Sequence, residues 1–153
     1  MKRLLLLLGS LALAGCNLNG YTTNGTPSDP ATESFATALG INISQMQKVL
    51  VGSEYVYYRD VTVGQGPTLT TARPAVITYA GFLSNGLRFD AQNSVEFDLS
   101  GTVIGFQRGM IGMNAGGERI IVVPSDLGYG PYGVGAVPPN STLVFDVKLE
   151  QIP

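Results

Sequence analysis

Few side chains of this 153-residue chain are of the types that usually do catalytic chemistry. The sequence has no histidine and a single cysteine. Without histidine, Ser-His and Cys-His nucleophilic sites are excluded, and so are the usual zinc and di-iron ligand sets. The eleven carboxylates are scattered, and they form neither a glycosidase pair nor a calcium loop. One cysteine cannot form an intramolecular disulfide. We therefore expect a function that needs no metal, cofactor or disulfide.

One glycine motif has the spacing of a nucleotide site but not its surroundings. Residues 128–133 match the GxGxxG pattern and follow a candidate strand. A dinucleotide site needs a helix to open at this point, within a βαβ unit. Pro131, Gly135 and Pro138-Pro139 prevent such a helix. The formal net charge of −2 supplies no basic surface, so we expect no nucleic acid partner either.

The lone cysteine closes a leader-like segment. Two basic residues precede an apolar run over residues 4–14, which ends in Leu13-Ala14-Gly15-Cys16. The run is shorter than the roughly 20 residues that span a bilayer, so a signal peptide is predicted over residues 1–15. Its end resembles the lipobox of bacterial lipoproteins, which implies that Cys16 is lipidated and begins the mature chain. The alternative is an ordinary signal peptide followed by an incidental cysteine.

Two short regions connect this leader to the rest of the chain. Residues 16–34 are rich in Asn, Thr, Gly, Ser and Pro. Because they have little apolar area to offset the entropy of ordering, we expect a flexible tether after the lipidated N-terminus. Residues 35–52 form an N-terminal extension with at most a short helix, near Ser44 to Leu50.

Residues 53–153 are predicted to form one antiparallel β domain. Over residues 75–83, Ile77 and Tyr79 on one face alternate with Val76, Thr78 and Phe82 on the other. The Asn85-Gly86 pair that follows suits a type I′ hairpin turn. Further strands are expected over residues 54–63, 87–90, 95–99 and 119–123. The clearest half-buried strand covers residues 142–150, where apolar and polar side chains alternate.

One segment has a helical period instead. Phe106, Met110 and Met113 recur at i, i+4 and i+7 within residues 105–113. Three glycines weaken this helix by about 0.8–1 kcal/mol each relative to alanine, so its apolar face must be packed. The predicted architecture is therefore α+β, a strongly bent antiparallel sheet of about five strands wrapped on one short helix.

Three blocks of this domain resemble the FKBP-type peptidyl-prolyl cis–trans isomerases. The first covers residues 76–90 and includes Asn85-Gly86, the second covers residues 103–109, and the third covers residues 124–147 with Val137-Pro-Pro-Asn140. They lie in order over about residues 52–153. The resemblance implies an FKBP-like fold and catalysis of Xaa-Pro isomerisation, which is slow because the peptide bond has a rotation barrier of about 18–20 kcal/mol.

The resemblance also implies roles for individual residues. Asp90 matches the acid beside Tyr79, and Tyr129 matches the tyrosine whose hydroxyl bonds a substrate carbonyl. Phe106 stands where the family keeps an aromatic platform, usually tryptophan, and a backbone N–H at Val103 or Ile104 would bind another carbonyl. The implied catalytic residues are Tyr79, Asp90 and Tyr129. The implied substrate-binding residues are Phe89, Val95, Val103, Ile104, Phe106, Val137 and Phe145.

Two functions from different classes follow from these residues. The isomerase reading is favoured by the joint presence of Asp90, Phe106 and Tyr129. The alternative is a proline-recognising adaptor or holdase chaperone with little turnover, favoured by Val95, where the family often has an aromatic residue, and by short loops. The expected partners are proline-containing segments of unfolded or folding envelope proteins, macrolide inhibitors, and a membrane reached through the N-terminal lipid. The expected location is the bacterial cell envelope, at the outer membrane facing the periplasm if the host is diderm.

Overall fold

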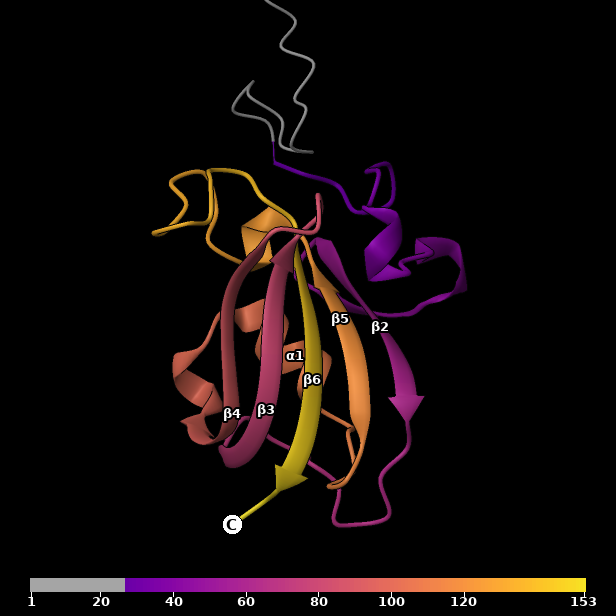
Figure 1. The fold of residues 1–153 in the computed structure, drawn as a ribbon, viewed down its shortest axis with the longest axis vertical. Helices are drawn as coiled ribbons and strands as arrows, with labels where there is room; N and C mark the ends of the chain where they lie inside the picture. The colour runs from indigo at the N-terminus through magenta and orange to yellow at the C-terminus, as the bar shows by residue number, and fades with distance from the viewer. Residues whose placement is uncertain (1–26) are drawn as a thin grey trace, which may run out of the picture.

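The computed structural model describes residues 27–153, in which six antiparallel strands form one bent sheet around a short helix (Figure 1). The strand order is β1-β2-β5-β6-β3-β4. The strands are β1 (Gln47–Val51), β2 (Glu54–Thr62), β3 (Pro74–Leu83), β4 (Arg88–Asp98), β5 (Glu118–Val123) and β6 (Leu143–Gln151). The helix α1 (Ile104–Met110) lies against the concave face of the sheet. The expected α+β architecture is confirmed, with β1 as an additional strand.

Alternating side chains on the central strands build the core beneath α1. Every second residue of β3 from Ala75 to Leu83 is buried, as are Phe145, Val147 and Leu149 on β6. Two of the glycines that weaken α1 allow it to approach β5. A Cβ on Gly105 would lie 2.3 Å from Val123 Cγ1, and one on Gly109 would lie 2.4 Å from Ile121 Cγ2. Close packing thus requires the residues that lower helix propensity.

The N-terminal extension covers the opposite, convex face of the sheet. Its apolar side chains pack on a second buried cluster formed by Tyr57, Val122 and Val144. The short helix expected near Ser44 to Leu50 is wrong, because a single 3-10 turn (Ile43–Gln45) leads directly into β1. Val49 on β1 pairs with Val56 on β2, so the apolar residues of this segment form the edge strand of the sheet and not a helix. Such short runs are ambiguous between helix and strand by periodicity alone.

Residues 28–34 are not the flexible tether that composition predicts. The Ser28 amide donates to Ser125 Oγ at 3.2 Å, Thr142 Oγ1 donates to Ser28 Oγ at 2.7 Å, and the Ala36 amide donates to Ser84 O at 2.7 Å. Hydrogen bonds hold this segment, and the apolar-area argument does not count them. The predicted signal peptide, Cys16 and the first part of the expected tether lie outside the described residues. No helix among the described residues is long and apolar enough to cross a membrane.

The two strands expected over residues 87–90 and 95–99 are joined into the single strand β4, which contains two register shifts. The hairpin before it is also different from the type I′ turn expected. Gly86 has φ +88°, but Asn85 is not among the described non-glycine residues with positive φ. The loop is therefore a three-residue turn in which Gly86 donates to Leu83 O at 2.9 Å.

Candidate active site

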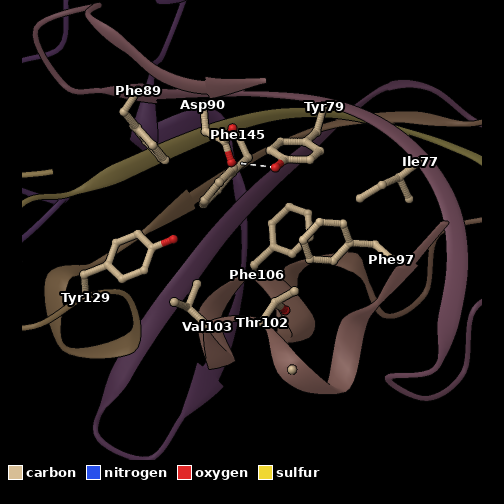
Figure 2. A pocket seen from close by; sticks show the side chains of 11 residues that line it. Ile77, Tyr79, Phe89, Asp90, Phe97, Thr102, Val103, Phe106, Tyr129 and Phe145 are labelled. Atoms are coloured by element: carbon tan, nitrogen blue, oxygen red, sulfur yellow. Dashed lines mark hydrogen bonds between the residues drawn. The ribbon is translucent and has the colours of Figure 1, made fainter. Parts of the chain in front are cut away.

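An apolar cavity of about 190 Å³ lies between α1, the concave face of β3, β4 and β6, and the loop that follows β5 (Figure 2). Most of its lining is aromatic or aliphatic, with polar groups at few points. The lining residues are Ile77, Tyr79, Phe89, Asp90, Phe97, Gly101, Thr102, Val103, Phe106, Tyr129 and Phe145.

Four aromatic rings in mutual contact line the cavity. Phe106, on α1, is 4% exposed, and its ring centroid lies 4.8 Å from that of Phe145 and 6.2 Å from that of Tyr79. Phe89 meets Phe145 edge-on at 5.8 Å. Tilted and edge-to-face pairs at these distances are favourable for aromatic rings. The result is a rigid apolar surface shaped for a flat or cyclic ligand group.

A register shift places two consecutive residues of β4 in the cavity. Gly81 pairs with Asp90 while Phe82 pairs with Arg88, so Phe89 is the extra residue of a bulge. Phe89 and Asp90 therefore both line the pocket, although neighbours on a regular strand face opposite ways. Gly81 makes room for this arrangement, since a Cβ there would lie 2.6 Å from Phe89 Cζ.

The polar side of the cavity contains two phenols and one carboxylate. The Tyr79 hydroxyl donates to Asp90 Oδ2 at 2.5 Å. Burial, followed by the hydrogen bond to Asp90 and the charge of that carboxylate, raises the pKa of Tyr79 above its usual value. Because the Tyr79 hydroxyl donates to Asp90, this hydrogen bond fixes the orientation of the Tyr79 ring in the cavity wall.

Tyr129 contributes a hydroxyl that has no hydrogen-bond partner among residues 27–153. Its hydroxyl points into the cavity from the loop after the 3-10 turn Ser125–Leu127 (Figure 2). Burial raises the pKa of Tyr129, and the nearby charge of Asp90 raises it further. The hydroxyl is thus protonated at neutral pH and can donate to a ligand carbonyl.

The comparison with known families agrees with this geometry. Residues 66–150 match the sequence profile of the FKBP-type peptidyl-prolyl cis-trans isomerase domain. The chain belongs to this family. Its relatives include FK506-binding protein 4 of Gibberella zeae, 41% identical over 98 residues, and an FK506-binding protein of Neisseria meningitidis, 32% identical over 100 residues. Each match covers 61% of this chain, but 20% of the first protein and 92% of the second.

A solved structure of the family supports the same fold. The crystal structure of FkpA from Escherichia coli superposes with a TM-score of 0.62 at 33% identity, over 68% of this chain and 50% of that one. This chain therefore spans about half of FkpA and a fifth of the Gibberella protein. The FKBP-like fold expected from the sequence blocks is confirmed.

At the entrance of α1, the structure distinguishes the two residues that the FKBP resemblance left open. Val103 is the N-cap residue and lines the cavity, whereas Ile104 begins the helix, is 38% exposed and does not line the cavity. The Val103 carbonyl accepts from the Phe106 amide. The Val103 amide itself donates no hydrogen bond within residues 27–153. It is therefore available to a ligand carbonyl, as unpaired N–H groups at helix starts commonly are.

Two further residues implied by the FKBP resemblance lie elsewhere. Val95 pairs with Ile77 and packs against the core without lining the cavity. Val137 is buried in the core and exchanges paired backbone hydrogen bonds with Val134 in the loop between the 3-10 turn Ser125–Leu127 and β6.

The aromatic wall missing at Val95 is supplied by Phe97, which sequence reasoning overlooked. Its ring meets that of Tyr79 edge-on at 6.0 Å. A signal was present, because Val95 and Phe97 share one face of the strand expected over residues 95–99. Ile77, Gly101 and Thr102 were also overlooked as lining residues.

Proposed function

We propose that this protein is a peptidyl-prolyl cis–trans isomerase that acts on Xaa-Pro bonds without covalent or metal chemistry. The observation that carries the proposal is the aromatic cavity with two donors at its edge, the Tyr129 hydroxyl and the Val103 amide. The cavity accepts the prolyl ring against Phe106. The donors hold the carbonyls that flank it.

The geometry suits a reaction in which only a bond rotation is catalysed. The planar peptide bond is protected by resonance, and the rotation barrier is about 18–20 kcal/mol. In the transition state the amide is twisted and has lost this resonance, so an apolar surface that fixes the ring while the carbonyl turns stabilises it selectively. Each tenfold acceleration requires about 1.4 kcal/mol, and a thousandfold acceleration requires roughly 4 kcal/mol. A few contacts that strengthen on twisting supply this.

The alternative function is a proline-recognising adaptor or holdase. It was favoured by Val95, but Phe97 provides an aromatic wall in its place, so the isomerase is supported better. Exchange spectroscopy on a hydrophobic-Xaa-Pro peptide, mixed with the full chain, separates the two. Faster cis–trans exchange supports the isomerase. Peptide or macrolide binding at an unchanged exchange rate supports the adaptor.

We also propose that the protein is anchored by lipid in a bacterial envelope and acts on proline-containing segments of envelope proteins there. The support is the basic and apolar leader before Cys16. Cys16→Ser is expected to release the protein from the membrane fraction of the producing cells. A variant that stays in that fraction contradicts the anchor and leaves the isomerase proposal intact.

A further inference from the structure

The second register shift in β4 decides which side chains face the cavity. Ile77 pairs with Val95 and Tyr79 pairs with Gln92, so one residue on β3, Thr78, faces two on β4, Asn93 and Ser94. Ser94, within this bulge, has φ +45°, a left-handed conformation that non-glycine residues rarely adopt. One extra residue reverses the face of every side chain beyond it. The bulge is therefore what turns the Phe97 ring inward, to the cavity, and leaves Glu96 exposed.

A bulge in β6 lies directly across β3 from the bulge at Ser94. Val76 pairs with Gln151 and Ile77 pairs with Leu149, which makes Glu150 the extra residue on β6. The two irregularities thus flank the same short stretch of β3 on its two edges.

A single carboxylate joins these two bulges. Glu150 Oε1 accepts from Thr78 Oγ1 at 2.7 Å, and Glu150 Oε2 accepts from Ser94 Oγ at 2.7 Å. The Ser94 amide donates to Thr78 Oγ1 at 2.8 Å, which closes the network. The hydrogen bond from Thr78, and then that from Ser94, lowers the pKa of Glu150, so it is an ionised acceptor at neutral pH.

We propose that Glu150, acting through Thr78 and Ser94, is a positioning residue that orients Phe97 as the wall of the prolyl site. Neither Glu150 nor its hydrogen-bond partners Thr78 and Ser94 line the cavity, so its effect on the substrate passes through the bulge. Without this network, β4 can pair with β3 in a register that has no bulge at Ser94. Phe97 would then leave the cavity, and the Glu96 carboxylate would face it. The inference rests on the proposed isomerase function for its kinetic consequence, but not for its structural one.

The test compares Glu150→Ala with the conservative Glu150→Gln, and with Lys148→Ala as a matched control on the same strand. In Glu150→Ala, we expect the KM for an Xaa-Pro peptide to rise roughly threefold to tenfold with a smaller change in kcat, as for the loss of one or two positioning hydrogen bonds. Glutamine can accept from Thr78 and donate to Ser94, so Glu150→Gln is expected to restore most of the binding. Lys148→Ala is expected to leave KM unchanged.

A structural readout accompanies the kinetics and is independent of activity. The nuclear Overhauser contact between the Phe97 and Tyr79 rings is expected in the wild type and in Glu150→Gln, and is expected to weaken or vanish in Glu150→Ala. Thr78→Val, which removes the shared hydroxyl but keeps the β-branched shape, is expected to act like Glu150→Ala and serves if that variant does not fold.

Two results overturn the proposal: an unchanged ring contact in Glu150→Ala and Thr78→Val, or a loss of thermal stability with KM and the contact both unaffected. If the wild type shows the ring contact but no turnover, the isomerase function fails while the positioning role is still decided by the contact alone.

Discussion

At the scale of the residue, the polar chemistry of the site depends on two phenols with different partners. The Tyr79 hydroxyl donates a hydrogen bond to Asp90, whereas the Tyr129 hydroxyl points into the cavity. A carboxylate beside a buried phenol keeps that phenol neutral, since ionisation would place two negative charges together. Asp90 thus maintains both hydroxyls as donors.

The pKa shifts of these phenols make a titration prediction. Both pKa values are raised above 10.0 in the fold, so Tyr79 and Tyr129 are expected to ionise after the exposed tyrosines. Their contribution to stability is complete below the unfolded value and is lost as the pH rises through the folded one. Ultraviolet titration of the wild type against Tyr79→Phe and Tyr129→Phe checks this. A variant that removes absorbance near pH 10 rather than above it contradicts the assignment.

At the scale of the element, two glycines and one buried arginine hold α1 close against β5. Arg119 is 5% exposed, pairs with Asp60 at 2.7 Å and donates to the carbonyls of Gly109 and Ile111 at the end of the helix. These contacts satisfy carbonyls that a helix leaves unpaired. The end of the helix is thereby fixed relative to β5, while Gly105 lets its start approach Val123 on the same strand.

The close approach of α1 to β5 can be tested with one methyl group. Gly109→Ala is expected to destabilise the fold by about 1–3 kcal/mol, because overpacking against Ile121 outweighs a gain in helix propensity of about 1 kcal/mol. Gly101→Ala is the control, since a Cβ there meets nothing within 4 Å. Urea unfolding measures both. A more stable Gly109→Ala contradicts the packing argument.

The elements also show how far sequence reasoning could go. Alternation predicted β3 and β6, and the i, i+4, i+7 spacing of Phe106, Met110 and Met113 predicted α1, because burial imposes those periods directly. Phe97 could not be preferred to Val95 in the same way. Alternation places both side chains on one face of the strand, and whether that face turns toward the cavity depends on the bulge at Ser94. That bulge is bonded through side chains of strands distant in sequence.

At the scale of the whole molecule, the sheet is covered on both faces. α1 packs on the concave side, and the N-terminal extension packs on the convex side over Tyr57, Val122 and Val144. The segment before the extension, residues 28–34, is tied by Ser28 to Ser125 and Thr142, the residues at the two ends of the loop that contains Tyr129. The composition of residues 28–34 predicted a tether because it is polar, but those polar groups find partners on the domain.

Glu33 makes the docking of this segment dependent on pH. Burial raises the pKa of its carboxyl above the usual value, and the charge of Asp29 raises it further, while the nearby hydroxyls of Ser84 and Thr142 act in the opposite direction. The folded state therefore binds this proton more tightly, so the contribution of Glu33 to stability is complete at acid pH and is lost as the pH rises through its folded pKa.

Glu33→Gln is accordingly expected to be more stable than the wild type near pH 7 and to lose that advantage near pH 4. Urea unfolding at the two pH values measures this. Glu96→Gln, at an exposed carboxylate on β4, is the control and should show no such difference. A Glu33→Gln variant that is less stable at neutral pH contradicts the burial argument.

The central claim is that the aromatic cavity catalyses prolyl isomerisation, and the kcat/KM of the purified protein on a hydrophobic-Xaa-Pro peptide tests it most directly. In the presence of the wild type, the peptide is expected to isomerise faster than at the uncatalysed rate. Phe106→Leu, which keeps an apolar side chain on α1 but removes the ring, is expected to lose roughly tenfold or more, or about 1.4 kcal/mol of transition-state binding. Val95→Ala, outside the cavity lining, is expected to change kcat/KM little. A wild type at the uncatalysed rate, or a Phe106→Leu variant as active as the wild type, contradicts the account.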